Sequence, residues 1–278
     1  MYFIKTEINL IKQSLQFLSN NKDLFILMAL NLIFIATIII MPFALVLEIA
    51  KMDPQLSGIN PIWVYWSLPA VVYLFVYCSG TFINAALISC IAARMQNQTA
   101  SITDGLRVAI SRLPSILAWG ILSAIIGVIL RQLSNQVESK NPVMMVVAVI
   151  SMPLSFLYDV SSYFILPYIV LKDLSLSDAI KEAKKLSLFR SIRVASITWL
   201  IAIPGFMIIF AVCYFITKGQ LPLDSRSSMV IFTIVVALLI AILQTFGMVL
   251  VAILKSAQFI HYVENNTMDS FNNGAFFR

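Results

Sequence analysis

The chain has 278 residues, of which 60% are hydrophobic and 12% are charged, and its formal net charge is +6. Soluble domains carry about 25% charged residues, so this composition excludes an ordinary soluble protein. The three cysteines are far apart within apolar stretches and provide neither a disulfide framework nor the spacing of a metal site. We therefore expect the protein to reside in a lipid bilayer.

Six long runs of the sequence contain no charged residue. A helix needs about 20 residues to cross a bilayer core, and each run approaches or exceeds that length. Backbone groups in lipid must be paired within the protein, so these runs are expected to be helices and not open strands. Membrane spans are predicted over residues 24–47, 69–95, 114–130, 142–171, 194–217 and 229–260.

The basic residues are distributed unevenly between the two sides of these spans. With the N-terminus inside, the cytoplasmic segments hold fourteen Lys and Arg residues and the outer segments hold five. This positive-inside bias predicts that both termini are cytoplasmic. Because topology accounts for the basic excess, we do not expect the protein to bind nucleic acid.

Three short amphipathic helices are predicted to lie flat at the cytoplasmic face, over residues 3–20, 102–113 and 175–189. The first has apolar residues at a 4-3-4-3 spacing, and its two heptads are too few for the alternative of a soluble coiled coil. Its apolar residues are Ile4, Ile8, Ile11, Leu15 and Leu18. The second and third helices open with Ser101-x-x-Asp104, which resembles a capping box, and Ser175-x-x-Asp178.

Each of these helices precedes an outward span, an outer loop and a return span. The fold class predicted is an all-α polytopic membrane protein, with six transmembrane helices arranged as three hairpins. One domain covers residues 1–264, and a polar cytoplasmic tail covers 265–278. Pro153 and Pro167 are expected to kink or break the fourth span. The small residues around Gly80 are expected to allow another helix to approach the second span closely.

Two segments carry a resemblance to a known family. Residues 14–24 (SLQFLSNNKDL) and 162–188, which contain SYFILP and then DAIKEAKKLSLF, resemble an uncharacterised bacterial family of six-span integral membrane proteins. The second segment is also loosely similar to the membrane domains attached to glycerophosphodiester phosphodiesterases. The resemblance implies a multi-pass protein of the bacterial cytoplasmic (inner) membrane. It implies no phosphodiesterase activity, because the metal-binding catalytic domain of those enzymes has no counterpart in this sequence.

Asp159 is the one acid inside a predicted span, and it falls near the middle of the bilayer. Acids at this depth are costly and often functional. Asn84 and Gln244 lie at similar depth and are candidate partners. One interpretation is a proton or cation relay, or the polar floor of a substrate cavity. The other is a neutral carboxyl group that fixes helix packing, since burial raises a carboxyl pKa.

A basic cluster begins on the third amphipathic helix and continues beyond it. Such a cluster attracts anionic lipid, although plain positive-inside anchoring would place the same charges there. The candidate lipid contacts are Lys181, Lys184, Lys185, Arg190 and Arg193. The interfacial helices and the C-terminal tail are the expected contacts for a partner protein or for a second copy of the chain.

The sequence contains no catalytic motif of the HExxH, GxSxG or phosphate-loop type. No catalytic residue, cofactor or metal site is therefore predicted. The function expected is that of a non-enzymatic scaffold or accessory subunit; the alternative is a small transporter or lipid-handling protein with a polar cavity around Asp159. A membrane enzyme would require Asp173, Asp178 and His261 to converge at the cytoplasmic headgroup level.

Overall fold

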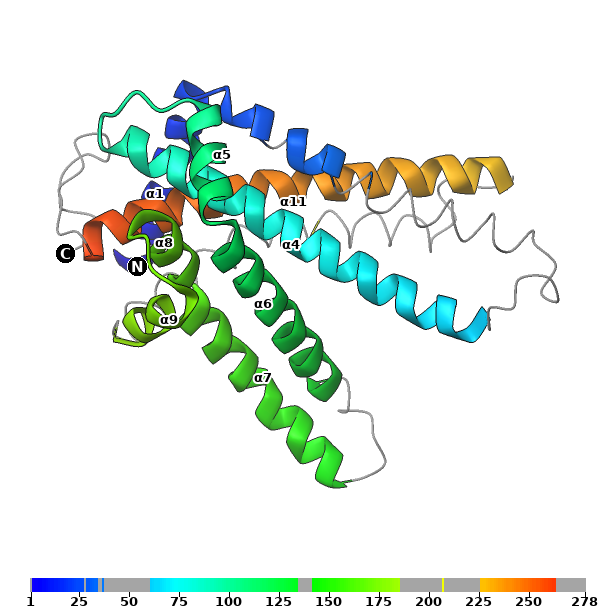
Figure 1. The fold of residues 1–278 in the computed structure, drawn as a ribbon. Helices are drawn as coiled ribbons and strands as arrows, with labels where there is room; N and C mark the ends of the chain where they lie inside the picture. The colour runs from blue at the N-terminus through cyan, green and yellow to red at the C-terminus, as the bar shows by residue number, and fades with distance from the viewer. Residues whose placement is uncertain are drawn as a thin grey trace.

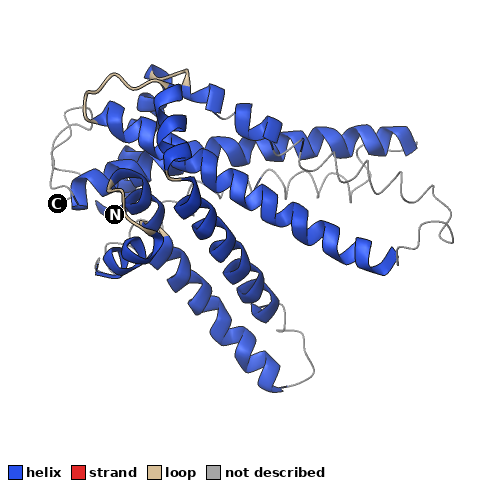
Figure 2. Cartoon of the chain, in the orientation of Figure 1, coloured by secondary structure: helices blue, strands red, loops and turns tan. Residues whose placement is uncertain are grey.

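The computed structural model describes residues 2–27, 29–34, 37, 61–134, 142–185, 207 and 226–263. All regular structure in this part of the chain is helical (Figure 2). The helices are α1 (Tyr2–Asn20), α4 (Pro61–Met95), α5 (Ile102–Ser111), α6 (Leu113–Ser134), α7 (Pro142–Ser162), α8 (Ile165–Leu171), α9 (Leu176–Lys185) and α11 (Arg226–Val263). Most of the first and fifth predicted spans, the tail 265–278, Arg190 and Arg193 lie outside the described residues.

Three of the described helical segments are long and apolar enough to cross a membrane. They are Ala70–Met95 within α4, Leu113–Ser134, which is α6, and Thr245–Val263 within α11. They fall in the second, third and sixth predicted spans. Large apolar side chains remain exposed on other faces, including Phe75 at 61% and Val143 at 66% exposure. Such exposure suits lipid and would be costly in water, so the structure indicates a membrane protein.

The described helices form two pairs whose far ends diverge (Figure 1). Helices α4 and α11 pack side by side and run in the same direction, while α6 and α7 form an antiparallel pair. The short helices α1, α5, α8 and α9 gather around the C-terminal halves of α4 and α11. The largest cluster of buried side chains lies at this end, built from residues 83–95, 163–170 and 249–260. This end therefore holds the packed interior of the described structure.

The fourth predicted span is not one helix but two. Helix α7 runs through Pro153 and ends at Ser162, and α8 begins at Ile165. Pro167 explains the position of the break, because it cannot donate a hydrogen bond and its ring clashes with the carbonyl four residues earlier, that of Tyr163. Within α8 the proline occupies the first turn, where a missing N–H costs nothing. The expected break near Pro167 is confirmed, and whether residues 142–171 together form one membrane span stays a prediction.

Helix α8 is an entirely apolar element apart from Tyr168, and residues 165–170 are all buried. Aromatic rings hold it against α11: the Tyr168 and Phe259 rings meet edge to face, with centroids 5.0 Å apart. Just before α8, the Tyr163 ring lies beneath Lys255 of α11, whose Nζ is 4.6 Å from the ring centroid. These contacts turn the end of the α7–α8 segment inward, toward α4 and α11.

Helix α1 packs against α11, and its buried side differs in part from the predicted apolar stripe. Leu18 is 2% exposed, as the stripe requires, but Leu15 is 41% exposed and Ser14 is fully buried. The position of α11 decides which side of α1 is covered, and the spacing of apolar residues in α1 does not reveal that position.

Close helix contacts occur at two glycines. A Cβ added at Gly105 of α5 would lie 2.6 Å from the Ala86 carbonyl oxygen of α4, so only a hydrogen fits there. On α6, a Cβ at Gly120 would lie 3.3 Å from the Cys78 Sγ. The glycine expected to serve this purpose, Gly80, has open space around it. The close approach expected around Gly80 occurs at its neighbours, because the Cβ at Gly120 would also lie 3.4 Å from the Cys78 Cα and 3.5 Å from the Thr81 Oγ1.

Gly105→Ala and Gly80→Ala should therefore have opposite effects on stability. Alanine relieves the entropic cost of a helical glycine, so Gly80→Ala should stabilise the protein by up to about 1 kcal/mol. Gly105→Ala gains the same entropic stabilisation, but its methyl group forces α5 away from α4. This displacement should cost about 1–3 kcal/mol of stability. Thermal unfolding of both variants in the same detergent measures the difference. Equal melting temperatures would contradict the close contact at Gly105.

Candidate functional site

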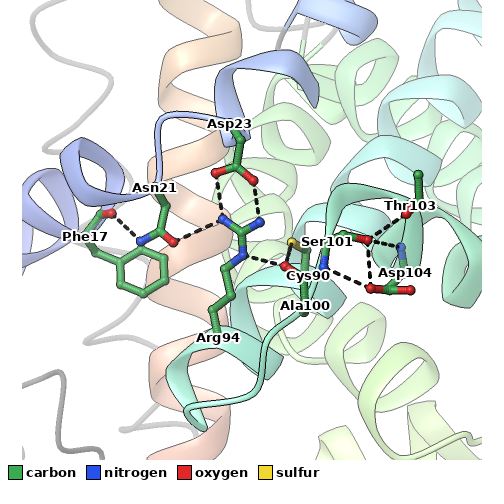
Figure 3. Close-up of polar contacts among 9 residues, drawn as sticks. All are labelled: Phe17, Asn21, Asp23, Cys90, Arg94, Ala100, Ser101, Thr103 and Asp104. Atoms are coloured by element: carbon green, nitrogen blue, oxygen red, sulfur yellow. Dashed lines mark hydrogen bonds and ion pairs between the residues drawn. The ribbon is translucent and has the colours of Figure 1, made fainter.

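The most extensive polar contact among the described residues joins α4 to the segment that follows α1 (Figure 3). Arg94, in the last turn of α4, binds both carboxylate oxygens of Asp23; its Nη1 donates to Oδ1 at 2.8 Å and its Nη2 donates to Oδ2. Nη1 also donates to Asn21 Oδ1 at 3.1 Å, and Nε donates to the Ala100 carbonyl at 2.9 Å. A bidentate pair of this kind combines charge with fixed geometry.

The sequence near Asn21 places the carboxylate where Arg94 can reach it. Helix α1 ends at Asn20, and the Asn21 side chain donates to the Phe17 carbonyl at 2.8 Å. The Asn21 backbone N–H donates to the same carbonyl at 3.1 Å, so the two bonds fix the side chain of Asn21 at the end of the helix. The chain then turns into the helical residues 24–27, and Asp23 lies in the turn. The Arg94 side chain is 14% exposed and the Asp23 side chain 42% exposed.

On its other side, Arg94 holds the loop that leads from α4 into α5. Asn97 adopts a left-handed backbone conformation with φ 60°, which asparagine tolerates better than most residues. The loop ends in the capping box that the sequence predicts: Ser101 Oγ accepts the Asp104 N–H at 3.3 Å, and Asp104 Oδ2 accepts the Ser101 N–H at 2.9 Å. These bonds hold the pKa of the Asp104 carboxyl below its ordinary value.

A second ion pair ties the start of α6 to the loop before α9. Arg112, between α5 and α6, contacts Asp173, whose backbone is left-handed with φ 58°. Pro114 explains why the helix is interrupted at Arg112, because its ring would clash with the Ile110 carbonyl in a continuous helix. One ion pair thus joins α4 to the segment after α1, and the other joins the junction of α5 and α6 to the loop between α8 and α9.

Helix α9 presents an apolar side to the protein and a basic side outward. Ala179 and Ala183 are buried, whereas Lys181, Lys184 and Lys185 are exposed. Lys181 pairs with Asp178 at 3.3 Å and Lys185 pairs with Glu182. Lys184 has no ion-pair partner within the described residues. The Ser175 hydroxyl and Lys181 hold the pKa of Asp178 below its ordinary value.

The predicted intramembrane site is distributed over three helices. Asp159 lies on α7, Gln244 on α11 and Asn84 on α4. The side chains of Asp159 and Gln244 lie outside the described part of the structure, so the convergence of the three residues stays a prediction. Asn84 is half-buried, and its Oδ1 has no hydrogen-bond partner in the described structure.

The residues that a membrane enzyme would need have other contacts. Asp173 pairs with Arg112, Asp178 donates its N–H to the Ser175 hydroxyl at the start of α9, and the His261 ring lies against Tyr262 with a centroid separation of 5.0 Å. Within the described residues, no group of three or more His, Cys, Asp or Glu side chains is placed to hold a metal ion.

The contact between Arg94 and Asp23 was missed at the level of sequence. Arg94 was counted there only as one of the basic residues that set topology. A usable signal was present: an acid just before one predicted span and a base at the end of the next lie on the same side of the membrane. Opposite charges at one membrane depth are natural partners.

These features indicate the class of protein. It is a membrane protein that is helical in its described part, and its polar contacts lie at one end of the molecule. The chain belongs to the DUF6159 family, a family of unknown function, which matches residues 64–268. No curated protein and no solved structure matches the chain. The expected membership of an uncharacterised family is confirmed, and the similarity to phosphodiesterase-attached membrane domains stays a prediction.

Neutralising the ion pair should weaken the packed end of the molecule. Arg94→Gln leaves a carboxylate and the Ala100 carbonyl without their donor, which should cost about 2 kcal/mol. Asp23→Asn should cost less than Arg94→Gln, because Asp23 is more exposed. If the side chains act together, the double variant should be less destabilised than the sum of the two singles, by about 1 kcal/mol. Chemical unfolding in detergent measures this, and strict additivity would contradict it.

Arg107→Gln provides the matched control for this cycle. Arg107 is exposed on α5 and is also a basic residue near Asp104, but it makes none of the contacts of Arg94. Its replacement should change stability by less than about 0.5 kcal/mol.

The ion pair between Asp23 and Arg94 should also make the stability of the protein depend on pH. The hydrogen bonds from Arg94 hold the pKa of Asp23 below its ordinary value of 3.8. The stabilisation is therefore complete above that value and is lost as the pH falls through the lower pKa of the folded state. The melting temperatures of wild type and Asp23→Asn should differ at pH 6 and converge below pH 3.8. A difference that persists unchanged in acid would contradict the assignment.

Proposed function

We propose that this protein is a non-enzymatic scaffold or accessory subunit of the bacterial inner membrane, which binds anionic lipid through α9. In this proposal the six predicted spans form three hairpins, both termini are cytoplasmic, and the short helices lie at the cytoplasmic face. The observation that carries the proposal is the orientation of α9. Its alanines are buried against the protein while three lysines project outward from a rigidly attached helix.

The attachment of α9 supports this reading. The loop before it is held by the contact between Asp173 and Arg112, and α9 packs on α8, which is itself buried. The lysines are therefore presented on a fixed element, and a fixed surface binds a ligand with less loss of conformational entropy. Lysine is a point charge with three donors and suits a lipid phosphate.

The three lysines should differ in their contribution. Two of them share their charge with an acid one turn earlier on the same helix, whereas Lys184 does not within the described residues. Basic side chains close to an anionic surface contribute about 1 kcal/mol each. Lys184 is therefore the residue whose replacement should release the most lipid.

Native mass spectrometry of the full-length protein, equilibrated with phosphatidylglycerol, tests the proposal. Lys184→Gln should reduce the retained lipid about fivefold, the ratio that corresponds to about 1 kcal/mol. Lys184→Arg should keep it, and Lys181→Gln, the matched control on the same helix, should reduce it less. Retention that is equal in wild type and Lys184→Gln would refute lipid binding by α9.

The scaffold part of the proposal needs a separate observation. Gentle extraction from the native membrane, followed by the same mass measurement, should show additional protein mass that is reproducible in identity. A bare monomer after such extraction would count against an accessory subunit, whatever the lipid result.

A further inference from the structure

A cavity of about 400 Å³ lies between the last turns of α4, the loop to α5, the start of α5 and the end of α8. One part of its wall is polar, with Gln96, Gln98, Thr99 and Asp104, and another part is apolar, with Val108 and Leu171. A cavity of this volume accommodates a small ligand or a lipid headgroup. Its mixed lining suits a molecule with a polar end and an apolar end.

The charge of the cavity is set by one residue. Asp104 is the charged side chain in its lining. Arg94 is close in sequence, but its guanidinium lies beyond Ala100 and is occupied by Asp23, Asn21 and the Ala100 carbonyl (Figure 3). Arg107 lies one turn further along α5 and does not line the cavity.

Asp104 keeps a free oxygen for a ligand. Both bonds from Ser101, one from its N–H and one from its hydroxyl, go to Oδ2. Oδ1 has no partner among the described residues. The capping box thus fixes the carboxylate in orientation while one of its acceptor atoms remains open. The depth also fits, since the cavity lies beside Arg94 at the end of the segment Ala70–Met95, where a membrane span gives way to headgroups.

We propose that this cavity binds the primary ammonium group of an amphipathic molecule, with Asp104 Oδ1 accepting its hydrogen bond and Val108 and Leu171 covering the adjacent carbon chain. The amide groups of Gln96 and Gln98 supply acceptors for the remaining ammonium hydrogens or donors for a neighbouring ester or phosphate. This chemistry is shared by the ethanolamine headgroup of a phospholipid and by a free alkylamine. The site is separate from the α9 lysines and needs a ligand of the opposite charge.

The test uses the full-length protein in detergent, with native mass spectrometry of retained phosphatidylethanolamine. Asp104→Asn should lower retention about fivefold, the contribution of an ion pair at the open end of a cavity. Val108→Phe, which fills the cavity and leaves Asp104 in place, should also lower it. Asp104→Glu should recover part of the binding. Thermal unfolding shows whether each variant remains folded.

Asp178→Asn is the matched control, because Asp178 occupies the equivalent Ser-x-x-Asp position on α9 and does not line the cavity. It should retain at least as much phosphatidylethanolamine as wild type does, because it leaves the cavity intact and only frees Lys181 on α9. If Asp104→Asn and Asp178→Asn retain equal amounts, and neither differs from wild type, a lipid amine is excluded as the ligand.

Hexylamine distinguishes the two sources of the ammonium group. Saturable binding of hexylamine that Asp104→Asn abolishes, without retained phosphatidylethanolamine, would assign the site to a water-soluble amine. Retained phosphatidylethanolamine that hexylamine displaces would assign it to the lipid. Absence of both from the folded wild-type protein would overturn the proposal. Phosphatidylglycerol retention by α9 is unaffected by any of these outcomes, so the two proposals fail separately.

Discussion

The described structure depends on one arginine that ends a membrane helix. Arg94 uses four of its five N–H donors, three on the segment after α1 and one on the loop before α5. Burying a guanidinium costs free energy unless its donors are paired, so the loss of any one partner would destabilise the protein. Arg94 adds to the apolar packing of α5 on α4 and of α1 on α11, and it holds the loop that lines the cavity beside Asp104.

The two ends of the described structure are packed differently. Away from the packed end the described helices expose valines and a phenylalanine that suit lipid, among them Phe75 and Val143. Toward the other end, polar side chains tie short helices to long ones, and the buried side chains are densest. The described structure therefore has one packed end from which the long helices diverge. Both proposed ligand sites lie at this packed end.

Local signals in the sequence located much of this structure. Ser101-x-x-Asp104 predicted the start of α5, and the apolar runs predicted where α4, α6 and α11 lie. These features depend on residues within a few positions of each other. The contact between Asp23 and Arg94 joins residues 71 positions apart, and no periodicity reveals it. Nor can hydropathy say which apolar flank meets protein and which meets lipid, because both surroundings favour the same side chains. The burial of Ser14 on α1 could not be predicted for that reason.

The buried helix α8 has a consequence for biosynthesis. Its neighbours include α4 and α9, both made before α11, and α11 itself. Ser256 of α11 also donates to the Ile88 carbonyl of α4 across 168 positions of sequence. Contacts of such separation form only when the later segment has left the ribosome. A chain stopped before α11 thus leaves uncovered the apolar sides of α4 and α8 that α11 packs against. Quality-control factors of the membrane would meet this surface on every truncated copy.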